Sequence, residues 1–195
     1  MNKFVIASNN KHKIKQFKSM LNDYDILTLD DIGFFEEIEE TGKTFLENAL
    51  IKAKTISEYL KAKDFNYGII ADDSGLCIPS LNGAPGIYSA RYAGNHDFKA
   101  NRDKLIADLK GKDHTGYFSS TIVLYYPDGT YIYKEGKTYG RIIEEERGDN
   151  SFGYECIFLS DDLNKTFGEA TLEEKNRISH RARALTALKE ELDKN

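Results

Sequence analysis

The sequence predicts a mixed α/β fold, and three regions of the chain carry this prediction. The first part alternates short apolar runs, typical of strands, with segments whose apolar residues recur at helical spacing. The middle contains strand-like runs separated by turn residues, and the last part returns to helical spacing. We therefore expect an elongated mixed sheet with flanking helices, arranged as two lobes around a central cleft.

The first elements alternate in type. Phe4–Ala7 is predicted to be a short apolar strand, and a polar turn follows it. Ile14, Phe17 and Leu21 then recur at the spacing of one helix face. Asp25–Leu29 has the composition of a second strand. The order strand, turn, helix, strand is that of an α/β unit.

A longer helix is predicted from about Thr44 to Leu60. Ala49 and Ala53 lie on its apolar face, four residues apart. The stretch before it, Phe34–Glu40, is acidic and shows no periodicity, so we expect it to be irregular.

The stretch Ile69–Gly75 holds the most informative pattern in the chain. Its small apolar residues predict a buried strand, so Asp72 and Asp73 are expected where that strand ends. Ligands of open α/β sheets bind just beyond the carboxyl ends of strands. Two adjacent carboxylates repel one another, and a Mg²⁺ ion would remove that cost. The alternative is an ordinary Asp-Ser-Gly turn after a strand.

The next segment is predicted to be a long ordered loop over Pro79–Asn95, rich in glycine, alanine, serine and tyrosine. A helix over Asp97–Leu109 follows, capped by either Asn95 or Asp97.

An antiparallel ribbon makes up the middle of the chain. Phe118–Tyr126 is strand-like, and Pro127–Thr130 is a hairpin turn. Tyr131–Tyr133 and Thr138–Glu145 continue the ribbon, and Tyr154–Leu159 is expected to return as a strand. Beyond it the chain is polar until the last predicted helix, whose apolar face is Ala182, Leu185, Leu188 and Leu192.

Length and composition restrict the class of protein. The 195 residues fit a single domain over 1–195, and the content of 40% hydrophobic and 30% charged residues is that of a soluble globular protein. A net charge of −5 does not suggest a nucleic-acid surface. Two distant cysteines and no long apolar segment lead us to expect a cytoplasmic protein without a membrane anchor.

The first polar turn is a candidate phosphate site. Ser8, Asn9 and Asn10 precede a helix N-terminus, which offers unpaired N–H groups and a positive dipole end. Lys11 and Lys13 add full positive charge. The alternative is that Asn10 or Ser8 only caps the helix and that the lysines are solvated.

A second candidate pair lies on the longer helix. Asn48 and Lys52 are four residues apart and share one face. Beside an acidic loop they could meet a phosphate and its metal ion. The alternative is a solvated polar stripe.

With these elements in place, the chain resembles the inosine triphosphate pyrophosphatases, also called the Ham1-like family. The resemblance runs in order over nearly the whole chain, and its coincident motifs are specific together although each alone is weak. The matching pieces are Ser8-Asn9-Asn10-Lys11-His12-Lys13, Glu39-Glu40-Thr41-Gly42 with Thr44-Phe45 and Glu47-Asn48-Ala49, Ala71-Asp72-Asp73-Ser74-Gly75-Leu76, Gly83-Ala84-Pro85-Gly86-Ile87-Tyr88-Ser89-Ala90-Arg91-Tyr92, Phe152-Gly153-Tyr154 with Ile157-Phe158, and Ser179-His180-Arg181.

The resemblance implies a cytoplasmic homodimer with a central active-site cleft. It also implies Mg²⁺-dependent hydrolysis of the purine nucleotides ITP, dITP and XTP to the monophosphate and pyrophosphate. Glu40 and Asp73 would be the metal ligands with Asp72 close by, and Asp73 would also be the general base. His180 and Arg181 would face the base, and Phe152 would stack on it.

The resemblance assigns the substrate to residues from both ends of the chain. The triphosphate would lie against Ser8–Lys13 with Lys52, and the base against residues of the last third. The full substrate-binding set is Ser8, Asn9, Asn10, Lys11, His12, Lys13, Lys52, Ser74, Phe152, Gly153, Tyr154, Glu155, Lys175, His180 and Arg181.

The chain departs from the family pattern at two places. Gln16 stands where the family often has Glu, which we expect to matter little. Glu155-Cys156 replaces the usual Asp-Pro, which lengthens the carboxylate side chain and removes the rigidity of proline.

Two alternative functions remain open. One is a nucleotide sensor without catalysis, which would not need the clustered acids, and the other is a pyrophosphatase for damaged pyrimidines or methylated bases.

Overall fold

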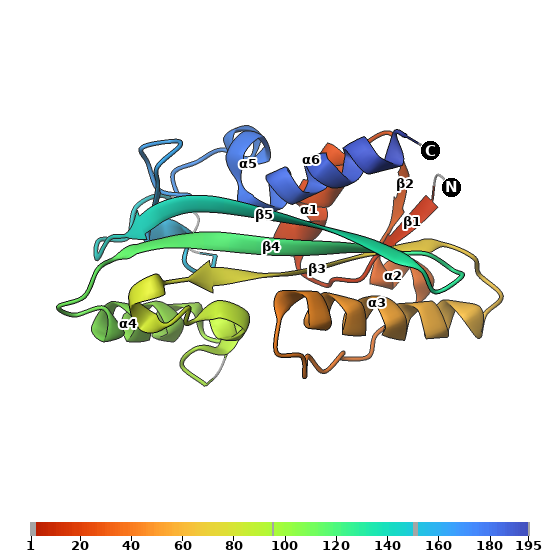
Figure 1. The fold of residues 1–195 in the computed structure, drawn as a ribbon, viewed down its shortest axis with the longest axis horizontal. Helices are drawn as coiled ribbons and strands as arrows, with labels where there is room; N and C mark the ends of the chain where they lie inside the picture. Colours follow the sequence, from red (N-terminus) through yellow and green to blue (C-terminus); the bar gives the residue numbers. More distant parts are fainter. Residues whose placement is uncertain (1–2, 95, 150–151, 195) are drawn as a thin grey trace. The chain divides into compact units, whose positions relative to one another are not determined.

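The computed structural model describes residues 3–94, 96–149 and 152–194, and these residues build one mixed sheet with helices around it (Figure 1). The strand order is β2-β1-β3-β4-β5-β6; β1 pairs in parallel with β2 and β3, and β5 pairs antiparallel with β6. The strands are β1 Lys3–Ile6, β2 Asp25–Leu27, β3 Gly68–Cys77, β4 Thr115–Tyr125, β5 Tyr131–Ile142 and β6 Phe158–Ser160. The α-helices are α1 Lys11–Met20, α2 Leu29–Ile32, α3 Phe45–Lys61, α4 Phe98–Asp108, α5 Leu172–Ile178 and α6 His180–Leu192, and the 3₁₀ helices are η1 Pro79–Leu81, η2 Gly86–Arg91 and η3 Glu155–Ile157.

The chain divides into two compact units, and β3, β4 and β5 contribute residues to both. Unit 1 comprises Met1–Asp73, Ser120–Glu135 and Arg181–Asn195. Unit 2 comprises Ser74–Ser119 and Gly136–His180.

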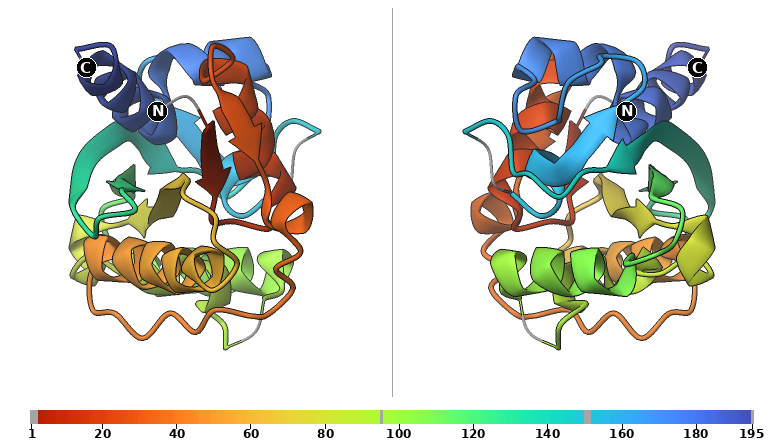
Figure 2. Two further views of the ribbon diagram at one scale, coloured as in Figure 1. Left: turned by 90° about the vertical axis from the view of Figure 1, so that its right-hand side faces the viewer. Right: turned by 90° about the vertical axis from the view of Figure 1, so that its left-hand side faces the viewer.

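Unit 1 has helices on both faces of its strands (Figures 1 and 2). Successive side chains of a strand point to opposite faces, and β1 shows this alternation directly. Val5, with Ala7 just beyond the strand, packs against α3, whereas Phe4 and Ile6 pack against α1 and α6. Each face therefore has its own apolar core, and the strands between them are buried on both sides.

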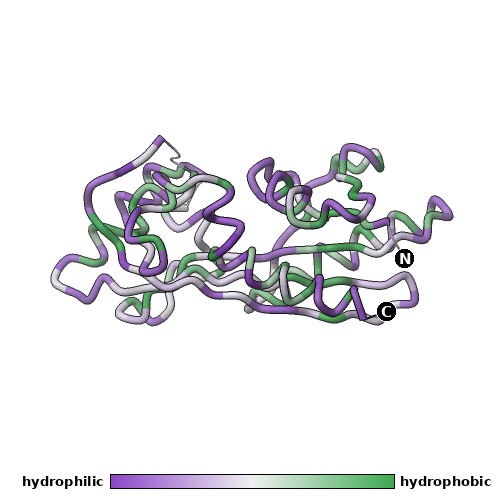
Figure 3. The backbone as a smooth tube through the Cα atoms, turned by 90° about the horizontal axis from the view of Figure 1, so that it is seen from above, coloured by the Kyte–Doolittle hydropathy of each residue, from purple (hydrophilic) through white to green (hydrophobic). Residues whose placement is uncertain are grey.

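Unit 2 has a core of its own, in which α4 packs against the strands. Leu105 and Leu109 of the α4 region meet Leu76, Phe118 and Phe158 in one buried cluster. Hydrophobic and hydrophilic segments follow one another along the backbone (Figure 3).

The structure confirms the mixed α/β class and most of the predicted elements. The helix predicted from Thr44 is α3, and Thr44 caps it by accepting a hydrogen bond from the Glu47 N–H. The helix predicted over Asp97–Leu109 is α4, capped by Asp97. The alternative cap, Asn95, lies outside the described residues.

The prediction that Asp72 and Asp73 mark the end of a strand is wrong. Strand β3 runs from Gly68 through both acids to Cys77. Polar residues look like a strand end in the sequence, because buried carboxylates are rare without partners. Here distant segments supply those partners, so the strand continues.

Other boundaries were also predicted wrongly. Strand β2 ends at Leu27, because Thr28 and Asp31 form a capping box that starts helix α2. The strand predicted over Tyr154–Leu159 is mostly the 3₁₀ helix η3, with β6 only at its end. The loop Pro79–Asn95 contains η1 and η2, and the polar segment after Thr171 is helix α5.

Gly75 fits a close approach between β3 and the following loop. A Cβ atom at this position would lie 2.2 Å from the Gly86 carbonyl oxygen and 2.5 Å from Ser89 Oγ. Ser89 Oγ in turn accepts the Leu76 N–H at 2.9 Å and donates to the Gly86 carbonyl. Only glycine at position 75 leaves room for this packing.

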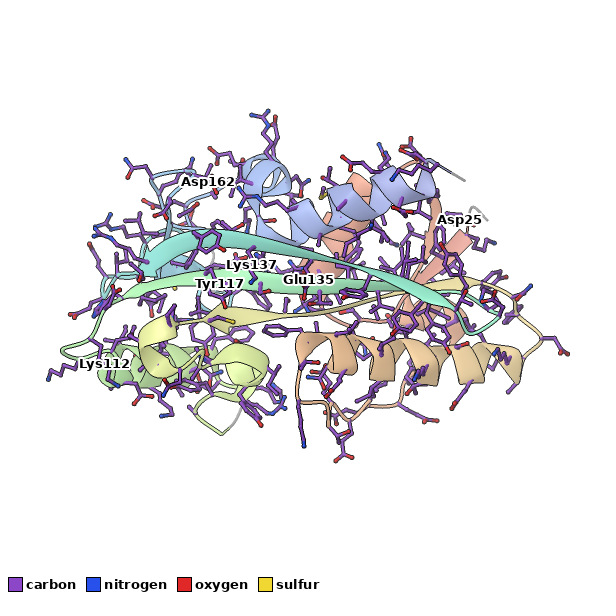
Figure 4. All side chains as sticks on the ribbon, in the orientation of Figure 1. Asp25, Lys112, Tyr117, Glu135, Lys137 and Asp162 are labelled. Carbon is purple, nitrogen blue, oxygen red and sulfur yellow. The ribbon has the colours of Figure 1, made fainter. Side chains whose placement is uncertain are left out.

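We expect Gly75→Ala to lower the free energy of unfolding by about 1–3 kcal/mol, because the added methyl group forces the loop away from β3. The measurement is denaturant unfolding of the variant and the parent. The matched surface control is Lys112→Ala; Lys112 is exposed and should change stability by less than about 0.5 kcal/mol (Figure 4). Equal effects of the two substitutions would contradict the packing argument.

Candidate active site

Asp72 is a buried carboxylate with cationic partners in unit 1. Its Oδ2 lies 2.9 Å from Lys13 Nζ and accepts a hydrogen bond from Arg181 Nε at 3.1 Å. Its Oδ1 accepts from Ser120 Oγ at 2.6 Å, and the Asp72 side chain is only 1% exposed. Burial by itself raises the pKa of this carboxyl, but Lys13 and Arg181 outweigh burial and hold the pKa well below its usual range. Asp72 is therefore ionised in the folded protein.

Asp73, the next residue of the same strand, points to the opposite face. Its Oδ2 accepts a hydrogen bond from Asn48 Nδ2 at 3.0 Å, and its Oδ1 lies 3.8 Å from Lys52 Nζ. Burial raises the pKa of Asp73 and Glu40 adds to this effect, while Lys52 opposes it. The two adjacent acids thus have opposite pKa shifts, because Lys13 and Arg181 outweigh burial at Asp72, whereas burial and Glu40 outweigh Lys52 and Lys13 at Asp73.

Asn48 and Lys52 are buried in unit 1, so the alternative of a solvated polar stripe is wrong. Lys52 Nζ donates to Glu40 Oε1 at 3.0 Å and to the Asp72 carbonyl oxygen at 2.8 Å. Asn48 Oδ1 accepts the Gly42 N–H at 2.8 Å, which ties the acidic loop to α3. Glu40 and Asp73 consequently converge on a single ammonium group.

The oxygen donors here suit a hard divalent cation. Two carboxylates, Glu40 and Asp73, approach the same cation, the Lys52 ammonium group. Mg²⁺ is commonly held by one or two carboxylates together with substrate phosphates. Within the described part of the chain, no group of three or more His, Cys, Asp or Glu side chains is arranged to hold a metal ion. Asp72 points away from this pair, so the donor set fits Mg²⁺ through Glu40 and Asp73 only.

The polar turn before α1 is a capped helix start. Asn10 Oδ1 accepts the N–H groups of His12 and Lys13, and Ser8 Oγ accepts the Asn10 N–H. The cap that the alternative proposed is therefore present, but Lys13 is not solvated, because it contacts Asp72. The side chains of Asn9, Lys11 and His12 are exposed, whereas burial lowers the pKa of Lys13 despite the neighbouring Asp72.

Arg181 lies in unit 1 and is buried beside Asp72. In addition to the Asp72 contact, its Nη1 donates to Gln16 Oε1 at 3.0 Å. Gln16 is 5% exposed. We expected from the sequence that this residue would matter little, and its contact with Arg181 was not predicted. The guanidinium thus joins α1, β3 and α6.

In unit 2, the residues predicted to contact the base are a mixture of packed and polar groups. Lys175 Nζ donates to Glu155 Oε2 at 2.9 Å, and both side chains are partly exposed. The His180 ring stacks on Phe118, with ring centroids 4.9 Å apart. Tyr154 is 3% exposed and donates its hydroxyl to the Ser89 carbonyl oxygen at 2.7 Å.

The remaining predicted residues of unit 2 lie on short connecting segments. Phe152 contacts the ring of Phe98 edge-on at 5.1 Å, and the Gly153 carbonyl accepts a hydrogen bond from Arg102 Nη1 at 2.9 Å. Ser74 lies on β3 and is partly buried. The sequence predicted no site role for Ser120, Gln16 or Arg102, each of which forms a hydrogen bond with a candidate site residue. Each is a polar residue whose burial becomes apparent only from contacts with distant segments.

No helix in the described ranges is long and apolar enough to cross a membrane.

The chain is similar to known proteins over nearly its whole length. A model of the Ham1 family matches residues 4–191. The dITP/XTP pyrophosphatase of Clostridium perfringens is 46% identical over 199 residues, covering 98% of each chain, and that of Bacillus subtilis is 46% identical over 99% of this chain and 98% of its own. Among solved structures, the Ham1 protein of Staphylococcus aureus matches with a TM-score of 0.85 at 40% identity over 98% of each chain. A Ham1 protein of Coxiella burnetii matches with a TM-score of 0.88 at 34% identity over all of both chains. At this identity and coverage, the chain belongs to the Ham1 family.

Proposed function

We propose that this protein hydrolyses the non-standard purine nucleotides ITP, dITP and XTP to the nucleoside monophosphate and pyrophosphate. The relatives named dITP/XTP pyrophosphatase support the substrate class. The single observation that carries the chemistry is the group of buried charges around β3 in unit 1. Asp72 is ionised between two cations, while Asp73 has a raised pKa next to Lys52 and Glu40. Perturbed carboxyl groups of this kind are typical of catalytic sites.

Lys13 and Lys52 are the proposed phosphate ligands, with exposed Lys11 adding positive charge nearby. Burial lowers the pKa of Lys13, so its ammonium gains from a further negative partner. Lys52 already contacts three oxygens, from Glu40, the Asp72 backbone and Asp73. We propose that the other residues of the turn, Ser8 to His12, border the phosphates.

Asp73 is the proposed general base. It takes a proton from a water molecule as the water oxygen forms a bond to the α-phosphorus, and the bond from that phosphorus to the bridging oxygen breaks. Pyrophosphate leaves with the electron pair. Asn48 holds the Asp73 carboxylate through its amide N–H, so the free lone pairs of Asp73 have a defined direction. Mg²⁺ held by Glu40 and Asp73 would neutralise phosphate charge as it develops.

Glu155 and Lys175 are the proposed readers of the base. Their ion pair places an acceptor beside a donor. A 6-oxopurine presents the complementary pattern, an oxygen at position six beside a protonated N1, whereas adenine presents the reverse. A site built for one pattern rejects the other, because the bound base would shield its polar groups from water and leave them unpaired. His180 and Phe152 are proposed to pack against the ring. Arg181, which the resemblance places at the base, has contacts that favour a role in holding Asp72.

We propose further that the protein acts in the cytoplasm as a homodimer of single-domain subunits, without nucleic-acid or membrane partners. The net charge of −5 supports the absence of a nucleic-acid surface. The homodimer rests on the family resemblance alone.

The test of the function is a panel of purified nucleotides, with pyrophosphate and phosphate release scored separately. ITP, dITP and XTP should yield pyrophosphate with Mg²⁺ present, and ATP should be a poor substrate. Full turnover in excess chelator would refute the metal assignment, and release of phosphate alone would refute the reaction.

Asp73→Asn and Asp72→Asn should have different effects on stability. Because the pKa of Asp73 is raised, folding favours the neutral form of this carboxyl. The stability that Asp73 contributes is therefore fully present below the ordinary aspartate pKa and is lost as the pH rises through the pKa of Asp73 in the folded protein. A neutral asparagine at position 73 should therefore leave stability at pH 7 unchanged or higher, while turnover is abolished.

Asp72→Asn should lower stability at pH 7 by roughly 3–5 kcal/mol, since it leaves Lys13 and Arg181 buried without their counter-charge. The lowered pKa of Asp72 means that its contribution is present above its ordinary pKa and is lost as the pH falls. Thermal unfolding and turnover of both variants test the assignment. Equal loss of stability in the two variants would show that the carboxylates have the same structural role.

The pH dependence of kcat/KM should reflect the ionisation of Asp73. A general base acts only when ionised, so activity should fall towards acid pH and rise as the pH increases. Activity that does not fall towards acid pH would exclude Asp73 as the base. The measurement is the pH profile of dITP hydrolysis at saturating Mg²⁺.

Lys175→Ala should reduce discrimination between ITP and ATP. It removes the donor proposed for the six-oxygen, so ITP should lose about 1–3 kcal/mol of transition-state stabilisation while ATP changes little. Lys13→Ala is the comparison, since loss of a phosphate ligand should slow both substrates by similar factors. If Lys175→Ala slowed ITP and ATP equally, Lys175 would have no part in reading the base.

A further inference from the structure

Helix α4 in unit 2 carries two adjacent polar residues that are almost completely buried. Asn101 is 2% exposed and Arg102 is 4% exposed. Neither was expected to have a function from the sequence. A buried guanidinium is costly unless it is paired and hydrogen-bonded, so the partners of Arg102 indicate what it holds in place.

The partners of Arg102 lie on the segment that leads to the proposed base readers. Arg102 Nε donates to Glu146 Oε1 at 2.8 Å, and its Nη1 donates to the Gly153 carbonyl oxygen at 2.9 Å. One turn earlier on α4, Phe98 contacts Phe152 edge-on at 5.1 Å. The same helix thus holds both the residue proposed to stack on the base and the residue next to it.

Asn101 holds the other loop that faces α4. Its Oδ1 accepts the Ala93 N–H at 2.7 Å, and its Nδ2 donates to the Ala90 carbonyl at 3.0 Å. The Tyr154 hydroxyl joins this loop to the segment Phe152–Glu155, which we call the base segment, because it donates a hydrogen bond to the Ser89 carbonyl at 2.7 Å. Helix α4 and the two loops therefore form a closed set of contacts, to which the ion pair of Arg102 with Glu146 belongs.

We propose that Arg102 is a positioning residue for base recognition, which fixes the segment Phe152–Glu155 on α4; this inference rests on the proposed function. Arg102 reaches the nucleotide only through the segment that it holds. Its hydrogen bond to Gly153 fixes the backbone between Phe152 and Glu155. Displacement of reacting or recognising groups by about 1 Å costs on the order of 10²-fold in rate, so a loosened segment should lose discrimination.

A merely structural role would produce a different result. Destabilisation of the whole fold lowers the active fraction equally for every substrate, so the ratio of kcat/KM for dITP to that for dATP stays constant. Displacement of the base segment changes that ratio, because only the 6-oxopurine has hydrogen bonds to lose. The substrate ratio, rather than activity alone, therefore distinguishes positioning from stability.

The principal variant is Arg102→Met, which keeps an unbranched apolar stem but removes both donors. We expect the dITP-to-dATP ratio to fall by about tenfold or more, mainly through a higher KM for dITP. Arg102→Lys should recover part of the ratio, since lysine keeps the charge but cannot reproduce the fork that reaches two acceptors. If Arg102→Met does not fold, Glu146→Ala serves instead; the Glu146 side chain is 44% exposed, so its removal only weakens the hold on Arg102.

Asp103→Ala is the matched control. Asp103 accepts hydrogen bonds from Lys99 Nζ at 2.7 and 3.0 Å on the exposed side of α4, so the substitution also removes a side-chain interaction made by α4 but touches no proposed base reader. Its substrate ratio should equal that of the parent. An unchanged ratio in Arg102→Met or its substitute, at temperatures where the variant is folded, would overturn the inference and leave the proposed function intact. A parent that hydrolyses dITP and dATP equally would refute the proposed function, and the inference with it.

Discussion

The ion pairs of Asp72 are the interaction on which the rest of unit 1 depends. A carboxylate with a 1% exposed side chain is stable only because Lys13 and Arg181 approach one oxygen and Ser120 the other. These partners come from α1, α6 and β4, which are distant in the sequence. One buried charge in β3 therefore joins the elements on one face of the strand. It also explains why β3 continues through a polar pair that would otherwise end it.

Because side chains alternate along β3, the adjacent acids Asp72 and Asp73 point to opposite faces of the strand and have different partners. Asp72 points to the face with the cations and is held ionised, whereas Asp73 points to the face with Asn48, Lys52 and Glu40, where burial raises its pKa. The proposed general base and a buried counter-ion thus lie side by side in the chain with different main partners, although Lys13 acts on both. Environment, rather than residue type, assigns different chemistry to chemically identical groups.

In unit 2, short segments are held in place by neutral contacts and by the buried Arg102. The absence of a side chain at Gly75 lets the Gly86 turn pack on β3, and Ser89 joins that turn to the strand and to Tyr154. Arg102 then ties the neighbouring segment to α4. Loops of this kind hold their shape through hydrogen bonds to rigid elements, which is how irregular backbone can position recognising groups.

The sequence by itself determined the mixed α/β class, the long helices and the family, because apolar periodicity, helix caps and ordered motifs are local signals. It also predicted roles for Asp72, Asp73, Lys13 and Lys52, which the structure places in two ion pairs, Lys13 with Asp72 and Lys52 with Asp73. Only the tertiary structure decided that β3 continues through both acids, that Arg181 lies against Asp72 and Gln16, and that Arg102 is buried. The physical reason is that a buried charge is stabilised by partners brought close only by folding, and neither their identity nor the pKa they impose is encoded in local sequence.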